Sequence, residues 1–449
     1  MKNLRSKILK ALLRVESGSY SNLLLDSELK KIKDQRDKNL FTEIFYGVIR
    51  NKLYLDYVIE SFSKTPLHKM DKEVLTGLRI GVYQLFFLDK IPARAAIYES
   101  VEAVKLILPA SRKGAVSFTN GVLRNINRKG NELTLPTKTE SKKEYLSVKY
   151  SYPIWIIKRF LDQYGFKKTE KILKAGNKRA EVIYRFNPLK MEKNEFERLM
   201  DQDGIKYENT FLDSFYRLKE VNNPAETQVF KNGAAYIQGT SAGLASLLLD
   251  PKENMSVLDL AAAPGGKTTH LAVLMKNSGQ ITALDVSQSR LNLIRENIER
   301  LGVKNVVLKM EDAVKYQDSK KYDRILADLP CSGLGLIASK PEIKWEKSES
   351  VIKQMASLQY DILSNNLSKL KPGGKLLYST CTLSQEENQD LINRILTENN
   401  NFELVNINKI LEEVSALNLK NENKYLELLP GEVDSEGFFY ALLKKVESD

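Results

Sequence analysis

The feature that most constrains the fold is the alternation of short apolar strands with amphipathic helical segments after residue 255. The strand-like runs are SVLDLAA, ITALDV, NVVLKM, DRILAD and GKLLYSTC, and polar, helix-forming stretches separate several of them. Such alternation is typical of a doubly wound, mostly parallel sheet covered by helices. The sequence therefore predicts a Rossmann-like α/β domain over residues 236–449.

The first part of the chain has a different pattern. The segments LYLDYVIESF, DKEVLTGLRIGVYQLFFL and AAIYESVEAVKLIL carry apolar residues at three- and four-residue spacing. This spacing predicts an all-α helical bundle over residues 1–130. Residues 131–147 are polar and lysine-rich, without a periodic apolar face, and we interpret them as a linker.

A third unit is predicted between the linker and the parallel sheet, over residues 148–235. Helical spacing over IWIIKRFLDQYG is followed by the strand-like EVIYRFN, the helical KNEFERLMDQDG and the strand-like SFYRLKEV. We expect a small α/β unit here. The fold class is therefore multi-domain, with a helical bundle, a small α/β unit and a larger α/β domain.

Charge is concentrated at the N-terminal end of the chain. Residues 1–130 contain 24 Lys and Arg against 13 Asp and Glu, which gives +11 of the total net charge of +12. A polyanion such as RNA would explain this excess through contacts with its phosphates. A basic surface that only keeps the protein in solution is an equally simple reading, and charge alone does not separate the two.

The sequence gives no sign of export or membrane insertion. No apolar run approaches the roughly 18 residues of a membrane span, and Lys10 and Arg14 interrupt the apolar stretch that a signal peptide would need. Two cysteines in 449 residues do not form a disulfide framework. We expect a cytoplasmic, monomeric protein with no membrane partner.

Residues that can react or bind a ligand follow the predicted strands, at the point where each strand ends. These residues are Asp259, Asp285, Asp312, Asp328 with Cys331, and Cys381. In doubly wound sheets, ligands bind beyond the carboxyl ends of the strands. The sequence therefore predicts an active site at this edge.

The loop AAAPGGKTTHLA (261–272) after the first strand has the small residues that let a ligand approach a helix N-terminus. The dinucleotide pattern GxGxxG fails here. The P-loop pattern fits Gly266, Lys267 and Thr268, but its first glycine falls at Ala261, and an ATPase remains one hypothesis. The loop can also be a turn that merely packs a helix on a strand.

The acids after the next two strands favour an adenosine ligand. Asp285 can accept hydrogen bonds from ribose hydroxyls, and Asp312 can accept one from an adenine amino group. Adenosine recognition without a complete phosphate-binding loop indicates S-adenosyl-L-methionine as the cofactor.

The two cysteines stand in polar turns, ADLPCSGLG (327–335) and YSTCTLSQEEN (378–388), after neighbouring predicted strands. A single cysteine is usually a small buried hydrophobe. Here Asp328 precedes one cysteine, and Lys267 at a nearby strand end can favour a thiolate. A thiolate and a carboxyl group are what methylation of cytosine carbon 5 requires, because carbon 5 becomes nucleophilic only after attack on carbon 6. Neither His68 nor His270 has a partner pattern that indicates a triad or a metal site, and His270 is interpreted as structural.

Together, LDLAAAPGGKTTHLA, ALDVSQSRL, EDAV, LADLPCSGLG and LLYSTCTLSQEEN resemble the Sun-type RNA cytosine-5 methyltransferases. The resemblance implies Cys381 as the nucleophile and Cys331 as the residue that assists release, with Asp328 and Lys267 as further catalytic residues. It also implies a cofactor and base site, with no metal, formed by Asp259, Ala261, Ala262, Ala263, Pro264, Gly265, Gly266, Lys267, Asp285, Asp312 and Asp328.

Two further segments carry the resemblance toward the N-terminus. VIYRFNPLK (182–190) is similar to the family's substrate-side motif, which implies RNA contacts for Arg185 and Asn187 in an RNA-recognition-like unit. IPARAAIYESVEAVKLI and SFTNGVLRNINR resemble the NusB-like RNA-binding domain of the bacterial RsmB branch. That branch implies 16S ribosomal RNA as the partner and a covalent cysteine–cytosine intermediate.

The sequence departs from the family at two places. Ala261 stands where a cysteine is usual, and Gly239 in YIQGTSAGL (236–244) stands where an acid commonly follows the glutamine. The second departure leaves the role of 236–244 open. A non-catalytic RNA-binding assembly factor, which would need neither cysteine, is the remaining alternative.

Overall fold

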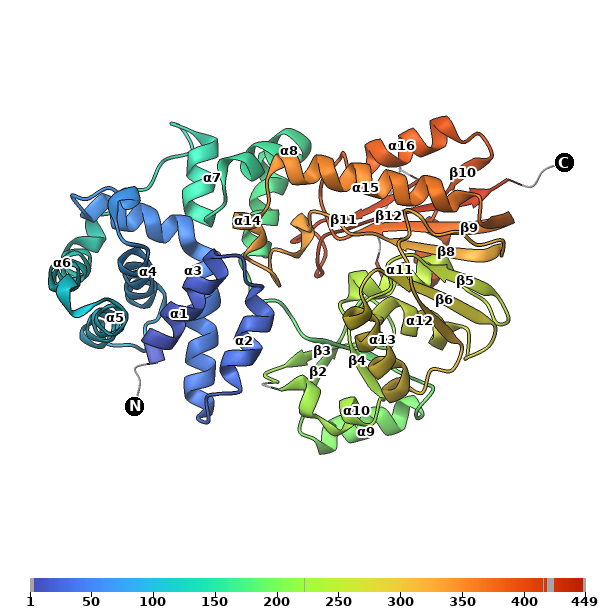
Figure 1. Cartoon of the computed structure of the whole chain (residues 1–449), viewed down its shortest axis with the longest axis horizontal. Coiled ribbons are helices and arrows are strands. Elements are labelled where there is room, and N and C mark those ends of the chain that lie inside the picture. The colour runs from blue at the N-terminus through green and yellow to red at the C-terminus, as the bar shows by residue number, and fades with distance from the viewer. Residues whose placement is uncertain (1–3, 222, 415, 418–423, 447–449) are drawn as a thin grey trace. The chain divides into compact units, whose positions relative to one another are not determined.

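The computed structural model describes residues 4–221, 223–414, 416–417 and 424–446 (Figure 1). The chain forms two compact units. The first contains Met1–Lys178 and Ile337–Glu346, and the second contains Arg179–Leu336 and Lys347–Asp449. Of the helices in the described ranges, none has the length and apolar character that crossing a bilayer requires.

The first unit is helical, as predicted. Its buried core includes Phe41, Ile44, Leu78 and Leu123. Gly81 allows two helices to approach closely, because a Cβ there would lie 2.6 Å from the Leu123 side chain. The helices are α1 (Leu4–Glu16), α2 (Ser21–Leu29), α3 (Gln35–Phe62), α4 (Lys72–Phe87), α5 (Ala93–Ile107), α6 (Lys113–Lys129), α7 (Lys142–Tyr150) and α8 (Ile154–Gly176), with 3-10 turns at Leu67–Lys69, Ala110–Arg112 and Gly130–Glu132.

A segment from much later in the chain completes this first unit. The short helix α14 (Ile343–Glu346) lies against α3, and the Trp345 indole N–H donates to the Ile49 carbonyl at 2.7 Å. The Lys344 ammonium is buried and donates to the carbonyl of Arg50 at 2.7 Å and the carbonyl of Ser151 at 2.9 Å. Burial holds the pKa of Lys344 well below its usual range.

The units divide the chain differently from the segments predicted from the sequence. Helix α8, which the sequence analysis placed in the small α/β unit of 148–235, belongs to the first unit. Helix α7 occupies part of the predicted linker 131–147. Its start is specified locally, because the Ser141 hydroxyl accepts a hydrogen bond from the Glu144 N–H as an N-cap.

The second unit contains a small antiparallel sheet with strand order β2-β3-β1-β4. Tyr184, Phe196, Met200 and Tyr216 form its core. The predicted strands and helix are confirmed as β1 (Ile183–Phe186), β3 (Phe215–Lys219) and α9 (Lys193–Gln202). The sequence analysis missed four further elements, which are β2 (Lys206–Asn209), β4 (Ala235–Ile237), a 3-10 turn (Pro224–Glu226) and α10 (Gln228–Lys231).

The larger sheet has strand order β10-β12-β9-β8-β5-β6-β7, with β11 paired to β12. The five predicted strands form its parallel part and are confirmed as β5 (Ser256–Asp259), β6 (Gln280–Asp285), β7 (Val306–Met310), β8 (Tyr322–Asp328) and β9 (Leu370–Thr380). The antiparallel strands β10 (Phe402–Val405), β11 (Leu426–Leu428) and β12 (Phe438–Lys445) were not predicted.

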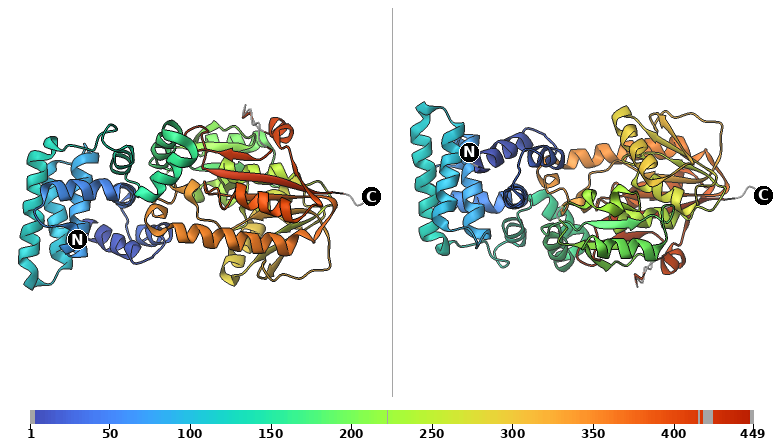
Figure 2. Two further views of the ribbon diagram at one scale, coloured as in Figure 1. Left: turned by 90° about the horizontal axis from the view of Figure 1, so that it is seen from above. Right: turned by 90° about the horizontal axis from the view of Figure 1, so that it is seen from below.

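Helices cover both faces of this sheet (Figures 1 and 2). One face carries α11 (Thr240–Leu249), α12 (Gly266–Leu274) and α13 (Gln288–Leu301); the other carries α15 (Glu349–Leu367) and α16 (Gln389–Glu398). A short helix, α17 (Asn408–Val414), packs on α11. The chain order reverses between β5 and β8, and this is the point at which open α/β sheets bind ligands.

Candidate active site

A hydrogen bond between the side chains of Asp259 and Thr268 joins the two ends of the loop after β5. Gly265 has φ +97° and precedes α12, a backbone conformation that glycine adopts without strain. The Thr268 hydroxyl is fully buried and donates to the Asp259 carboxylate at 2.7 Å. A P-loop threonine would instead face a magnesium ion, so this geometry argues against the ATPase hypothesis.

Burial raises the pKa of Asp259 to about 7, and the nearby charge of Asp328 also raises it, against the lowering effect of the Thr268 hydrogen bond. The Asp259 side chain lies at the sheet's switch point beside the base of the loop.

Asp259→Asn should change how stability depends on pH. The folded pKa is raised, so the folded wild type holds a proton that the unfolded chain has already lost, and its free energy of unfolding falls as pH rises toward and through 7. From pH 5 to pH 8 the variant should therefore gain about 2 kcal/mol relative to wild type. Urea unfolding at both pH values measures this difference, and parallel pH profiles would contradict it.

Arg185 holds the same loop from the small sheet. Its guanidinium is 1% exposed and donates to the Gly266 carbonyl and to the Gln238 side-chain oxygen, both at 2.6 Å. Asn187 is also buried, and its amide donates to the carbonyls of Gly233 and Leu301 at 2.8 and 2.9 Å. The sequence analysis expected these side chains to contact RNA. Both side chains are instead buried and connect internal elements of the second unit, so they offer no surface to RNA in this structure.

The acids after β6 and β7 stand in turns that they help to form. The Asp285 carboxylate accepts from the Ser287 N–H at 3.0 Å and lies 3.4 Å from the Arg290 guanidinium. Asp312 is exposed and accepts from the Val314 N–H at 2.9 Å. Both carboxylates lie at the predicted edge of the sheet.

Val286 was missed in the sequence analysis. It follows Asp285 directly, and its side chain is 63% exposed. An exposed apolar side chain next to a buried strand-end acid offers a flat surface to an aromatic ring beside a hydrogen-bond acceptor. The signal in the sequence was an apolar residue that continues past the end of the strand, into the polar turn SQS.

The parallel pairing of β8 with β9 brings the two cysteines together. Asp328 lies opposite Ser379 in the register, and the turns that follow place the sulfur atoms of Cys331 and Cys381 3.2 Å apart. Both thiols are free and partly exposed. The expectation that these strand-end residues meet at one edge is therefore met for the cysteines.

Lys267 and Asp328 form an ion pair beside the thiols. The Lys267 ammonium lies 2.6 Å from one Asp328 oxygen, and the other oxygen accepts from the Ser379 hydroxyl at 2.8 Å. Burial lowers the pKa of Lys267, but the charges of Asp328 and Cys381 outweigh burial and raise it overall. Lys267 is therefore a cation at neutral pH, next to Cys381.

The surroundings of Cys331 differ from those of Cys381. The pKa of Cys331 is raised well above its usual range by its hydrogen bond with Cys381, then by burial, and then by the negative charges of Cys381, Glu387 and Asp328. Cys331 thus remains a neutral thiol, whereas the cationic Lys267 lies near Cys381. The sequence analysis assigned different roles to the two cysteines, but this asymmetry depends on contacts that only the fold brings about.

The remaining histidine interpretation agrees with the structure. His270 lies on α12 and is 5% exposed, and its ring packs edge-on against Phe215 with 5.7 Å between centroids. Burial holds the pKa of His270 well below its usual range, as expected for a neutral structural histidine.

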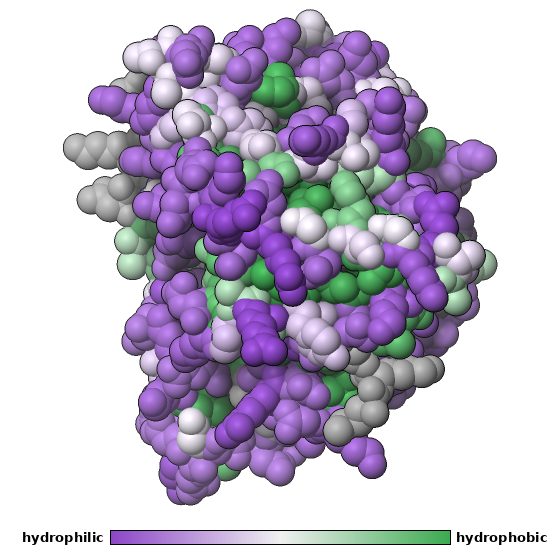
Figure 3. Space-filling model, turned by 90° about the vertical axis from the view of Figure 1, so that its left-hand side faces the viewer, coloured by the Kyte–Doolittle hydropathy of each residue, from purple (hydrophilic) through white to green (hydrophobic). Residues whose placement is uncertain are grey.

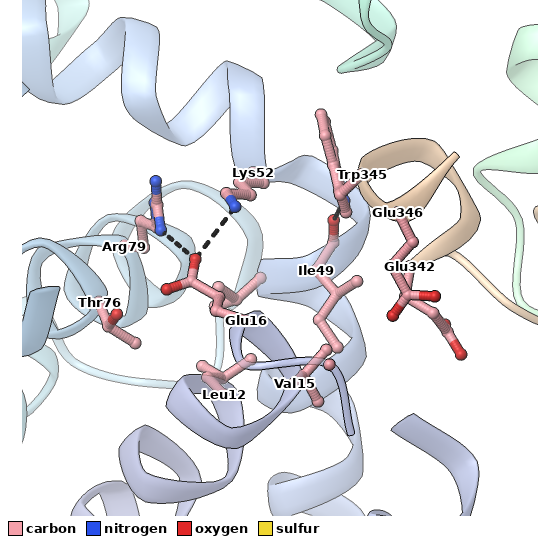
Figure 4. A pocket seen from close by; sticks show the side chains of 12 residues that line it. Leu12, Val15, Glu16, Ile49, Lys52, Thr76, Arg79, Glu342, Trp345 and Glu346 are labelled. Atoms are coloured by element: carbon pink, nitrogen blue, oxygen red, sulfur yellow. Dashed lines mark hydrogen bonds and ion pairs between the residues drawn. The ribbon is translucent and has the colours of Figure 1, made fainter. Parts of the chain in front are cut away.

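A separate pocket of about 340 Å³ lies within the first unit, among α1, α3, α4 and the Glu342–Glu346 segment (Figure 4). At its centre, Glu16 pairs with Arg79 at 2.7 Å and with Lys52 at 3.1 Å. None of the predicted catalytic or cofactor residues lines this pocket.

Family models match three parts of the chain. The 16S rRNA methyltransferase RsmB/F model matches residues 246–444, the NusB family model matches 2–128, and the RsmF/B-like ferredoxin-like domain matches 152–219. The first two agree with the predicted catalytic and helical domains, and the third overlaps the predicted small α/β unit.

Full-length relatives and solved structures agree with these matches. The chain is 37% identical to the probable ribosomal RNA small subunit methyltransferase B of Bacillus subtilis and 32% identical to ribosomal RNA small subunit methyltransferase B of Shewanella oneidensis, with 99% of each chain covered in both cases. It resembles the crystal structure of PH0851 with a TM-score of 0.82 at 29% identity, covering 99% of this chain and 98% of the other.

A methyltransferase homologue from Pyrococcus horikoshii matches with a TM-score of 0.59 at 30% identity, covering 68% of this chain and 99% of its own. These likenesses favour a methyltransferase over the ATPase hypothesis. With identity of this level along its whole length and a NusB domain before the catalytic part, the chain belongs to the family of ribosomal RNA small subunit methyltransferase B proteins.

Proposed function

We propose that the protein transfers a methyl group from S-adenosyl-L-methionine to carbon 5 of a cytosine in 16S ribosomal RNA, through a covalent bond between Cys381 and the base. The observation that carries the proposal is the pair of free thiols, 3.2 Å apart, beside the Lys267–Asp328 ion pair. Bisulfite sequencing of 16S ribosomal RNA from a deletion strain tests it: one cytosine should lose its protection. A fully unchanged pattern would contradict the proposal.

The attack step uses Cys381, Lys267 and Asp328. Carbon 5 of cytosine becomes nucleophilic once a thiolate has added to carbon 6. The Lys267 cation lies near Cys381, and its ion-pair partner Asp328 supplies a carboxyl group beside the two thiols. We infer that Asp328 interacts with the ring as charge develops during the attack.

The release step uses Cys331. The C5–H bond breaks, the C5–C6 double bond re-forms and the C6–S bond breaks. Cys331 can give its thiol proton to the departing Cys381 sulfur, 3.2 Å away, and take up the proton from carbon 5. This exchange suits a cysteine that is a neutral thiol at rest, as the raised pKa of Cys331 implies.

The residues at the sheet edge fit the proposed methyl donor. Asp285 supplies acceptors for ribose hydroxyls, the exposed Val286 supplies apolar surface for a purine, and Asp312 can accept from an exocyclic amine. The loop 261–266 brings small residues close to the N-terminus of α12. When bound, the cofactor supplies an electrophilic methyl group on a sulfonium.

Asp285→Ala should weaken S-adenosyl-L-methionine binding by one to two orders of magnitude, because a buried acceptor for two hydroxyls is lost. RNA binding should change little. Calorimetric titration with the cofactor measures the first effect, and a filter-binding assay with RNA measures the second. Unchanged cofactor affinity would contradict a cofactor site at the end of β6.

The basic helical unit is proposed to bind RNA phosphates. On the face drawn in Figure 3, hydrophilic side chains surround a central band of apolar ones. Arg124, Arg128 and Lys129 are exposed on α6. Reversing all three to Glu should lower RNA affinity and reduce the slope of log affinity against log salt by about 0.7 to 0.9 per lost phosphate contact.

A matched control reverses three exposed lysines of the second unit, Lys252, Lys276 and Lys304, which precede β5, β6 and β7 at the edge opposite the proposed active site. This control has the same change in net charge but should keep most of the salt slope. Equal losses in both triple variants would mean that net charge alone is responsible.

A further inference from the structure

The turns that carry the two cysteines are joined by a buried carboxylate that the mechanism above does not use. Glu387 is fully buried. One of its oxygens accepts from the Ser332 N–H at 2.9 Å, and the other accepts from the Ser332 hydroxyl at 2.5 Å. Ser332 directly follows Cys331, so Glu387 holds the first cysteine turn at two points.

The same network reaches the second cysteine turn. The Ser332 hydroxyl lies 2.6 Å from the Thr382 hydroxyl, and Thr382 directly follows Cys381. The Thr382 hydroxyl also accepts from the Leu334 N–H at 3.3 Å. Next to Glu387, the Asn388 amide donates to the Thr382 carbonyl at 3.0 Å. One short segment thus connects both turns through serine and threonine hydroxyls.

The hydrogen-bond partners of Glu387 favour its ionised form. The Ser332 backbone N–H and the Gln359 side-chain NH₂, which lies 3.0 Å from Glu387, can only donate. A carboxylate that receives several donors is stabilised in its ionised form, although burial acts in the opposite direction and raises the pKa of Glu387. With the Ser332 hydroxyl donating to the other oxygen, the network provides three donors to a negative charge on Glu387.

We propose that Glu387 is a positioning residue that sets the distance between the Cys331 and Cys381 sulfurs and keeps Cys331 in the thiol form that release requires. The hydrogen bonds from Ser332 to Glu387, together with the contact between the Ser332 and Thr382 hydroxyls, form a bridge that fixes the spacing of the two turns. The charge of Glu387 disfavours a second negative charge at Cys331. The raised pKa of Cys331, to which Glu387 contributes, agrees with this role. The part of the inference about release rests on the proposed function, whereas the parts about distance and charge do not.

Two variants separate the bridge from the charge. Glu387→Gln is neutral, but its amide can still accept from the Ser332 N–H and donate to the Ser332 hydroxyl, so the bridge is retained. Glu387→Ala removes both. Asp390→Asn is the matched control, because Asp390 is an exposed carboxylate three residues later whose side chain accepts from Gln385.

The charge is tested without RNA or cofactor. In a Cys381→Ala background Cys331 is the one cysteine left in the sequence, so the rate of iodoacetamide labelling as pH is raised reports on Cys331 alone. Adding Glu387→Gln should increase Cys331 labelling at neutral pH by on the order of tenfold, since a neighbouring negative charge is lost. Asp390→Asn should have no effect. Identical titrations with and without Glu387 would overturn the electrostatic role.

The bridge is tested with phenylarsine oxide, a trivalent arsenical that binds tightly only to two thiols held close together. Wild type and Glu387→Gln should both bind it, and Glu387→Ala should lose at least tenfold in affinity. If Glu387→Ala folds and binds it as wild type does, the positioning role is wrong. If Glu387→Ala does not fold, substitution of Thr382 by Val, which removes the hydroxyl that links the turns, provides the same measurement.

The consequence for release is measured last. With RNA and S-adenosyl-L-methionine, Glu387→Gln should accumulate a gel-stable enzyme–RNA adduct, as Cys331→Ala is expected to do. If Cys331→Ala accumulates the adduct and Glu387→Gln does not, the link to release is refuted. If neither does, the covalent function proposed above fails, and the thiol titration and arsenical binding still decide the role of Glu387.

Discussion

Cys381→Ala should abolish methyl transfer, with a loss on the order of 10⁴-fold or more, because the residue that opens the covalent route is removed. No adduct between enzyme and RNA should appear on denaturing gels. Cofactor and RNA binding should persist, since Cys381 is partly exposed and its substitution removes one sulfur atom at the edge of the core. Transfer of labelled methyl groups to 16S ribosomal RNA measures the loss.

Cys331→Ala should fail in a different way. Attack and methylation remain possible, but release is impaired, so a gel-stable adduct should accumulate in the presence of S-adenosyl-L-methionine. The assignment is supported by the environments of the two thiols: Cys381 is near the Lys267 cation, and the pKa of Cys331 is raised. An adduct trapped by Cys381→Ala, and none by Cys331→Ala, would reverse the two roles.

The same experiment addresses the non-catalytic alternative. An RNA-binding assembly factor would need neither thiol, so a strain carrying the double substitution Cys331→Ala and Cys381→Ala should then modify and assemble its ribosomes normally. Methylation that is lost while the protein is still present at normal amounts would rule that alternative out. The close approach of the two sulfurs at a strand-end edge already favours chemistry over packing.

The parallel part of the fold was predictable because its signal is local. Each of the five strands from β5 to β9 is a short apolar run that ends in a polar turn, and the carboxyl ends of parallel strands meet at one edge. Hence Asp259, Asp285, Asp328 and the two cysteines could be placed together from the sequence. The antiparallel strands β10 to β12 were missed because β12 pairs with β9 and β10, which lie far from it in the sequence, and because β11 is only three residues long.

Other features depend on contacts between residues far apart in the sequence. A strand residue such as Arg185 gives no local sign that its guanidinium turns inward to the Gly266 carbonyl, 81 residues away. Likewise, Lys344 looks like a surface lysine, but the fold buries it against carbonyls of the helical unit. Helical periodicity over 148–178 shows that a helix forms, but not which core it joins: α8 lies in the first compact unit, whereas the ferredoxin-like domain match 152–219 includes it.

Substitution of Lys267 should also lower the rate of methyl transfer strongly. Lys267→Met keeps the length and apolar stem of the side chain but removes the cation beside Cys381 and the ion-pair partner of Asp328. The rate of methyl transfer at neutral pH should fall by about 10² to 10³-fold, since removal of one electrostatic contact at a reacting centre costs about that much.

A control at the other end of α12 separates this effect from a general loss of charge. Lys276 is exposed just after α12 and pairs with Glu253 on the surface, so Lys276→Met should leave the rate unchanged. Iodoacetamide labelling of Cys381 in a Cys331→Ala background should slow at neutral pH with Lys267→Met and not with Lys276→Met. A Lys267→Met enzyme with unchanged Cys381 labelling but reduced methylation would mean that the lysine acts through Asp328 and the bound base rather than through the thiol.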